Sequence, residues 1–319
     1  MKRLTFKLLA GATLTFVLIF LNACQKETFD SQNLKEVQNP VAADRSAGHI
    51  TYGVTRFDGV NACEIVGIEE GSGNVVSQTN ATVIDPSGNL VVLDNLKGIC
   101  LTSWGQYFIT TGSPASSNLG VSAYDNALFK VDPVGGQCSY FGSVCPFGTV
   151  SDLEFNPLTN TFFGLLNNSN NILEIQPDVN GNYTVYTPPA AIIGINGRIL
   201  SGLSLVRDQS NTYLVGAATR PGVTILDAQL YQIPAGGGLA AFMTNLAPLG
   251  DFAGGHCGIG FDLDLNHLAV NRANPAISTL APGLNEVNPW VAPPLPGVTN
   301  TNNWGPASFD FEDLTSSVY

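Results

Sequence analysis

Residues 151–163 read SDLEFNPLTNTFF, and altered copies of this phrase return about every 50 residues along the chain. Later copies begin at Gly202 and Gly258, a shortened copy begins at Ser308, and a weaker copy begins at Gly98. Each copy opens with a short apolar run, passes through turn residues and continues as a second short apolar run. This pattern predicts pairs of short strands joined by tight turns. The chain is therefore expected to be built from repeated β-structure.

Residues 202–244 show one repeat strand by strand. The predicted strands are residues 203–206, 212–216, 229–233 and 239–243. The same four-part pattern fits residues 98–144 and 151–187. Repeats of about 40 to 50 residues with four short strands are typical of propeller blades. The sequence thus predicts an all-β fold, a single β-propeller over residues 49–319.

The two ends of this domain are expected to meet in one blade. Residues 308–319 would supply its inner strand, and residues 50–55, 62–66 and 74–77 would supply the other strands. Sharing a blade between the ends removes free sheet edges. Inner strands near residues 98, 151, 202, 258 and 308 give five blades. A six-bladed ring is the alternative, with residues 82–92 forming part of the additional blade.

Residues 1–23 have the features of a bacterial export signal. Lys2, Arg3 and Lys7 form a basic start, and residues 8–20 form an apolar stretch too short for a comfortable membrane span. Residues 21–24, LNAC, resemble a lipobox, which implies that Cys24 is acylated and becomes the first residue of the mature chain. The alternative is an ordinary secretory signal that happens to contain a cysteine.

Residues 24–48 are polar and poor in aromatic side chains, so they are predicted to be the lipidated cysteine and a flexible tether. The residue after the cysteine is Gln25, not the Asp that marks retention in the inner membrane. Residues 24–27, CQKE, resemble the export tag of surface lipoproteins in Bacteroidetes. The resemblance implies an outer-membrane lipoprotein that is held by its Cys24 acyl chains and faces the periplasm or the cell surface.

The acidic net charge of the chain limits the classes of molecule that it is expected to bind. Removing residues 1–23 removes three basic and no acidic residues, leaving 10 basic against 25 acidic residues and a net charge of −15. Nucleic acids and anionic lipids are bound mainly through Lys and Arg, so neither is expected as a partner. An unknown protein or a glycan remains compatible with this surface.

Five cysteines follow the lipobox, and an exported protein lies in a compartment that permits disulfides. Cys138 and Cys145 are close enough in sequence to pair, and Cys63 with Cys100 would link strands of the first repeat, which leaves Cys257 over. The alternative is that most of these residues are buried apolar thiols.

Two sequence features resemble a known group of proteins. Residues 155–162, FNPLTNTF, and residues 128–133, LFKVDP, are similar to the repeats of the broad YVTN/NHL-like group of bacterial β-propellers. The resemblance covers residues 50–319 and implies the architecture. It implies no activity, because this fold carries enzymes, scaffolds and receptors alike.

Loops that lead into inner strands, or that join second to third strands, contain the candidate ligand-binding residues. These are Asp152, Asn196, Arg198, Arg220, His256, Arg272 and Trp304. The three arginines and Lys97 are expected on one face, where they would bind an anionic or sugar ligand with Trp304 as a stacking platform. The alternative is that polar side chains lie in these loops only because loops face solvent.

A second hypothesis is a metal-dependent hydrolase or lactonase at the mouth of the channel. A resemblance to gluconolactonase-like propellers would make Asp152, Asn196 and His256 ligands of a metal ion that activates water. Three histidines leave no multi-histidine site, and no nucleophile elbow or phosphate-binding loop is present. We therefore predict a binding or scaffold module, with no catalytic residues, no cofactor and no resident metal ion.

Overall fold

The computed structural model describes eleven stretches of the chain. They are residues 50–55, 63–69, 74–116, 122–167, 169–207, 212–220, 229–245, 256–261, 267–271, 277–279 and 311–316. All of them belong to one compact unit, residues 42–319. Within these stretches the only helix is a single 3-10 turn at Ser122–Tyr124, and no helix is long and apolar enough to cross a membrane.

The described strands form five sheets. Sheet 1 has the order β22 (Phe311–Ser316), β1 (Ile50–Thr55), β2 (Glu64–Glu69), β3 (Val75–Ile84) and β4 (Leu90–Leu93). Sheet 2 has the order β5 (Leu96–Leu101), β6 (Tyr107–Thr111), β7 (Ala127–Val131) and β8 (Cys138–Val144). Sheet 3 contains β9 (Val150–Asn156), β10 (Thr161–Leu166), β11 (Asn171–Pro177), β12 (Tyr183–Tyr186), β13 (Ala190–Ile193) and β17 (Gly238–Leu239). Sheet 4 has the order β14 (Ile199–Arg207), β15 (Thr212–Thr219), β16 (Gln229–Ile233) and β18 (Ala241–Asn245). Sheet 5 has the order β19 (His256–Phe261), β20 (His267–Asn271) and β21 (Ile277–Thr279).

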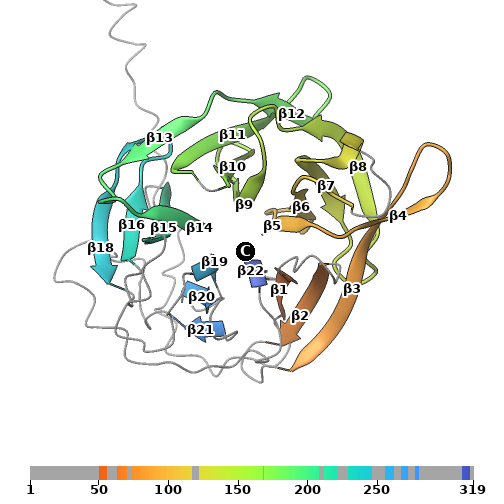
Figure 1. Cartoon of the computed structure of the whole chain (residues 1–319), viewed down its shortest axis with the longest axis horizontal. Helices are drawn as coiled ribbons and strands as arrows, with labels where there is room; N and C mark the ends of the chain where they lie inside the picture. The colour runs from red at the N-terminus through yellow and green to blue at the C-terminus, as the bar shows by residue number, and fades with distance from the viewer. Residues whose placement is uncertain are drawn as a thin grey trace, which may run out of the picture. The chain divides into compact units, whose positions relative to one another are not determined.

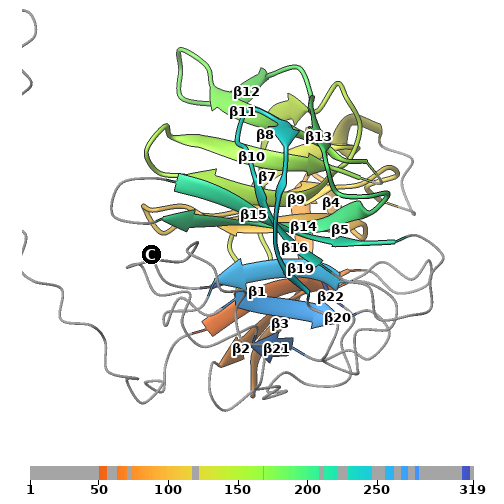
Figure 2. The same cartoon turned by 90° about the vertical axis from the view of Figure 1, so that its left-hand side faces the viewer.

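The sheets are arranged around a centre, with the first strand of each sheet innermost (Figure 1). Inner strands β22, β5, β9, β14 and β19 contact one another in a cycle that returns from β19 to β22. Seen from the side, strands of successive sheets such as β10, β15 and β19 lie across the view one below another (Figure 2). This is the arrangement of a β-propeller, so the predicted all-β propeller architecture is confirmed.

The ends of the domain meet as predicted. Strand β22 pairs antiparallel with β1, with Thr51 opposite Ser316 and Val54 opposite Asp313. The inner strand of sheet 1 therefore comes from the C-terminal part of the chain and its next three strands come from the N-terminal part. Because β22 is hydrogen-bonded to β1 and also contacts β19, the ring is closed between the first and the fifth sheet.

Continuous apolar runs in the strands follow from this arrangement, because each sheet is covered on both faces by its neighbours. All six residues of β10 are buried. Phe162 belongs to the core between sheets 2 and 3, while its neighbour Phe163 belongs to the core between sheets 3 and 4. Adjacent strand residues point to opposite faces, so one strand contributes to two cores.

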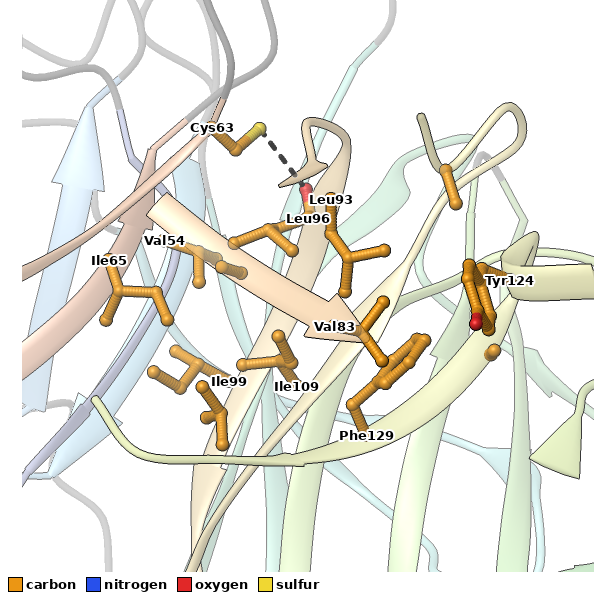
Figure 3. Packing of buried hydrophobic residues seen from close by; sticks show 14 of the residues in the cluster. Val54, Cys63, Ile65, Val83, Leu93, Leu96, Ile99, Ile109, Tyr124 and Phe129 are labelled. Carbon is orange, nitrogen blue, oxygen red and sulfur yellow. Dashed lines mark hydrogen bonds between the residues drawn. The ribbon is translucent and has the colours of Figure 1, made fainter. Parts of the chain in front are cut away.

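The core between sheets 1 and 2 shows how such a joint is filled (Figure 3). Val54 and Ile65 of sheet 1 pack against Leu96 and Ile99 of sheet 2. All four side chains are at most 1% exposed. At the edge of this core the Cys63 thiol donates to the Leu96 carbonyl oxygen at 3.9 Å.

Two sequence expectations need correction. Residues 82–92 do not begin another sheet: residues 81–84 of β3 pair with β4, from Ala81 opposite Leu93 to Ile84 opposite Leu90, and this hairpin extends sheet 1. In sheet 3 the fourth position is shared, because β12 pairs with one end of β11 and β13 with the other. Strand β13 also pairs in parallel with β17 and so links sheet 3 to the chain of sheet 4, which the repeat pattern did not reveal.

The described cysteines are thiols, which agrees with the alternative to disulfides given in the sequence analysis. None of Cys63, Cys100, Cys138 and Cys145 forms a disulfide with another of these four residues, and three of them are buried. Cys138 begins β8 and Cys145 follows its end, so at about 3.3 Å per residue they are too far apart for a disulfide. Cys63 and Cys100 belong to different cores, on opposite faces of sheet 2. The side chain of Cys257 lies outside the described residues.

Candidate functional site

The inner strands give the ring two distinct faces. Strands β22 and β5 run in the same direction, because Asp313 and Thr315 accept hydrogen bonds from Ile99 N and Leu101 N, at 2.8 and 3.2 Å. Strands β9 and β14 are related in the same way, because Asp152 accepts from Leu203 N and Glu154 accepts from Leu205 N. We call the face on which these strands begin the strand-start face, and the face on which they end the strand-end face. The predicted ligand-binding loops belong to the strand-start face.

Two of the predicted basic residues are brought together on the strand-start face. Arg198 directly precedes β14 and Arg220 directly follows β15. The register places Ile199 opposite Thr219, so the two arginines lie opposite each other at the end of this hairpin. Arg198 is 4% exposed, whereas Arg220 is exposed. Arg198 is therefore buried beneath the strand-start face, and Arg220 lies at its surface.

Asn196 lies in the turn that leads into β14. Its φ of 52° is in the left-handed region, which Asn tolerates better than most residues, and its side chain is exposed. The turn is closed by a hydrogen bond from Arg198 N to the Ile195 carbonyl oxygen at 3.1 Å. Asn196 is thus presented on the strand-start face two residues before Arg198.

Asn170 holds this corner in place, and the sequence analysis missed it. Its Nδ2 donates to the Arg198 carbonyl oxygen at 2.8 Å, and its Oδ1 accepts from Leu200 N at 2.9 Å. One amide side chain from the β10–β11 turn therefore fixes the backbone on both sides of the start of β14. The only sequence signal is an Asn in a second-to-third loop, which is too common to single out.

Asp152 lies inside the ring and not on the surface of the strand-start face. Its side chain is fully buried, and its Oδ2 accepts from Leu203 N of the neighbouring inner strand at 2.9 Å. No described residue donates a hydrogen bond to its Oδ1. This contact gives Asp152 a structural role, as a side-chain-to-backbone link across the joint between sheets 3 and 4.

The link formed by Asp152 is one of a repeated set. Two residues further along β9, the Glu154 side chain accepts from Leu205 N. In the joint between sheets 1 and 2 the same two positions are taken by Asp313 and Thr315. In each case side chains at alternate positions of one inner strand satisfy the free backbone N–H groups of the next inner strand. We call these contacts inner-strand links.

The two joints differ in charge. The joint between sheets 3 and 4 has two carboxyl groups, Asp152 and Glu154, on one face of β9, where the first joint has a carboxyl and a hydroxyl. Burial raises the pKa of Asp152 to about 8, against smaller lowering effects of the Leu203 and Leu153 N–H groups. Burial also raises the pKa of Glu154 well above its usual range, and the charge of Asp152 adds to this.

Gly98 replaces the first carboxylate in the joint between sheets 2 and 3. A Cβ at this position would lie 3.0 Å from Leu153 Cβ, Leu153 N and Thr110 Oγ1. Instead Thr110 Oγ1 accepts from Gly98 N and donates to the Val150 carbonyl oxygen, both at 2.8 Å. The absence of a side chain at residue 98 thus lets β5 and β9 approach closely.

The metal hypothesis depends on three residues, of which two can be placed. Asp152 is buried among backbone groups of β14, and Asn196 is exposed in a turn. His256 begins β19, but its side chain is outside the described part of the chain. Among the side chains that the structure describes, no group of three His, Cys, Asp or Glu residues is placed to hold a metal ion.

The remaining predicted residues are only partly visible. Lys97 is the second residue of β5 and is half-buried at the strand-start face. Arg272, Trp304 and Cys24, the predicted acylation site, lie outside the described residues. The structure therefore brings Arg198, Arg220 and Asn196 to one corner, whereas the Asp152 side chain is hydrogen-bonded to Leu203 N inside the ring.

Comparison with known proteins does not assign this chain to a family. No family model matches the sequence, and no curated protein matches it. A solved protein from Lactobacillus plantarum is similar at 11% identity over 74% of this chain and 63% of that chain, with a TM-score of 0.39. The chain thus spans less than two thirds of that protein.

Other solved structures are similar to the same low degree. A putative gluconolactonase shares 12% identity over 75% of this chain and 77% of that chain, with a TM-score of 0.37. A chain of a nidogen/laminin complex shares 10% identity over 85% of this chain and 98% of that chain, with a TM-score of 0.42. Virginiamycin B lyase from Staphylococcus aureus shares 12% identity over 76% of this chain and 84% of that chain, with a TM-score of 0.38. Likenesses this low carry no statement about the activity, ligand or partner of this chain.

Proposed function

We propose that this chain is a five-bladed β-propeller that is anchored to the outer membrane through acylated Cys24 and acts as a binding or scaffold module. Its ligand is a protein or glycan that carries anionic groups. The binding surface is the strand-start face around Asn196, Arg198 and Arg220, with Lys97, His256, Arg272 and Trp304 contributed by the neighbouring blades. No cofactor takes part.

The observation that carries this proposal is the pair of arginines at the end of the β14–β15 hairpin. The chain has 13 basic residues against 25 acidic ones, and two of the few basic residues lie opposite each other at one hairpin end, with Arg220 exposed beside the buried Arg198. Guanidinium groups bind carboxylate, sulfate and phosphate groups in a fork geometry. Asn170 fixes the backbone beneath Arg198, which reduces the ordering cost of binding.

Five blades are proposed from the contacts among the inner strands. Strands β22, β5, β9, β14 and β19 contact each other in one closed cycle. The residues that a sixth blade would have used belong instead to the β3–β4 hairpin of sheet 1.

The test is binding to immobilised acidic glycans, with uronic-acid and sulfated chains as probes and neutral chains of the same length as reference. Arg220→Ala is expected to reduce binding to the acidic probes by about tenfold, the effect of losing one charge-assisted contact of about 1.4 kcal/mol. Lys130→Ala is the matched control, because it removes the same charge from β7, away from the strand-start loops. Equal loss in both variants, or no preference for acidic over neutral chains, would remove the arginine pair as the binding site.

A further inference from the structure

The point at which the chain joins the ring gives the molecule an orientation. Strand β1 begins at Ile50, and its next residue Thr51 is opposite Ser316, at the end of inner strand β22. Since inner strands end on the strand-end face, the chain that precedes Ile50 meets the ring on that face. The proposed tether and the proposed ligand-binding loops are therefore on opposite faces.

The strand-end face also presents apolar side chains at its turns. Four described turns of sheets 2 and 3 lie there, following β5, β7, β9 and β11. Each carries one exposed apolar residue: Trp104 is 44% exposed, Val134 61%, Leu158 63% and Val179 101%. These four turns, which we call the apolar turns, contain no Lys or Arg.

The apolar turns are held in fixed conformations. The Asp132 carboxylate accepts from Val134 N at 3.0 Å, and Asp178 Oδ1 accepts from Asn180 N and Asn182 N at 2.8 and 2.9 Å. The Trp104 ring rests against Phe155 of the neighbouring sheet, with ring centroids 4.7 Å apart. Rigid turns display their side chains without a further loss of conformational entropy on binding.

We propose that the strand-end face of sheets 2 and 3 rests on a zwitterionic lipid surface, with Trp104, Val134, Leu158 and Val179 inserted among the headgroups. An exposed indole and aliphatic tips suit the boundary between headgroups and acyl chains. Because the apolar turns lack basic residues and the chain is acidic, anionic lipid is disfavoured. This inference rests on the proposed lipid anchor at Cys24.

The length of the tether favours lipid over a protein partner for this face. About 26 residues separate Cys24 from Ile50, and a flexible chain of that length has a mean span of roughly 30 Å. With Cys24 acylated, such a tether would keep Ile50 within roughly 30 Å of the bilayer on average. At such an effective concentration, weak insertion of four side chains is sufficient for stable contact. The strand-start face is then turned away from the bilayer and is accessible to a ligand.

The test uses the full lipidated chain in phosphatidylcholine liposomes that contain brominated lipid, which quenches nearby tryptophan fluorescence. Trp290→Phe and Trp304→Phe leave Trp104 as the only tryptophan of the three in the chain. Phe147, in the turn between β8 and β9 on the strand-start face, is also 44% exposed and provides the matched control position. The control chain carries Trp104→Phe and Phe147→Trp in the same background.

We expect the emission of Trp104 to fall by at least about twofold in brominated liposomes, while a probe at residue 147 is not quenched. Combined Val134→Ser, Leu158→Ser and Val179→Ser substitutions should reduce the quenching of Trp104, and far-UV circular dichroism verifies that this variant is folded. Equal quenching at both positions, or none at residue 104, overturns the orientation. Mass spectrometry separates the two proposals: an acylated chain without quenching overturns only the orientation, whereas a chain without acyl groups on Cys24 overturns the anchor and the orientation together.

Discussion

Replacing Asp152 by Asn should make the protein more stable at alkaline pH and change little at acidic pH. Asn keeps an oxygen to accept from Leu203 N, and it removes the carboxyl group whose pKa is raised to about 8 by burial. Below about pH 4 the carboxyl is protonated in both the folded and the unfolded chain. Between about pH 4 and 8 only the unfolded chain releases the proton, so the wild-type protein loses stability as the pH rises.

The size of the effect follows from the pKa. A rise from 3.8 to about 8 is about 4 pKa units, and at about 1.4 kcal/mol per unit the wild-type protein loses up to about 6 kcal/mol of unfolding free energy across this range. Asp152→Asn should abolish most of that loss. At about pH 4 the two proteins should agree within about 2 kcal/mol, because both side chains offer an oxygen to Leu203 N and the amide buries one more N–H than the protonated acid. Glu154, whose pKa is also raised by burial, should leave a remaining slope of the same sign in the variant.

The assay is urea unfolding at several pH values, with the slope against urea checked for constancy so that midpoints report stability. Asp178→Asn is the control. Hydrogen bonds from the Asn182 and Asn180 N–H groups lower the pKa of this partly exposed turn residue, so its contribution is present at neutral pH and is lost as the pH falls. The reasoning fails if the wild-type protein and Asp152→Asn lose stability in parallel between about pH 4 and 9.

Three further outcomes are expected. Cys24→Ser should release the folded domain from the membrane fraction, as read by fractionation and immunoblotting; retention in the membrane would contradict acylation at this residue. Removal of residues 311–319 takes away the inner strand of sheet 1, so the shortened chain should lose cooperative thermal unfolding, and an unchanged melting transition would argue against ring closure by β22. Gly98→Ala should lower the unfolding free energy by about 1–3 kcal/mol because its Cβ meets Leu153, while Gly236→Ala, which meets nothing within 4 Å, should be neutral in the same denaturant titration.

Much of the architecture could be predicted from the repeated phrase. The alternation of apolar runs and turn residues over 202–244 and 98–144 matches the strands of sheets 4 and 2 to within a few residues, because each blade is a local unit of hairpins. The Asn180-Gly181 turn is a hairpin, with the Gly181 φ of 84° that this dipeptide favours. The shared first blade was also predicted, since the phrase at 308–319 lacks partner strands of its own.

The candidate site was less predictable, because it depends on contacts between blades. The sequence predicts Asp152 in a loop at a channel mouth, yet its partner is Leu203 N, a backbone group some 50 residues away that no local pattern identifies. Glu154 and Asp313 were not singled out for the same reason. The sequence does contain a related pattern: Asp152 is followed two residues later by Glu154, and Asp313 by Thr315. The pattern can be interpreted only once the inner strands are known to lie parallel to one another in a ring.

The pairing of β22 with β1 has a consequence for when the ring can form. Residues 50–55 can pair with residues 311–316 only after the latter have been synthesised, so sheet 1 has no inner strand until nearly the whole domain has been made. Sheets 2, 3 and 4 are contiguous in sequence and can assemble as the chain is made, but the seam closes only afterwards. In the proposed export, the chain would therefore cross the membrane as an open series of hairpins, and the ring would close in the compartment that receives it.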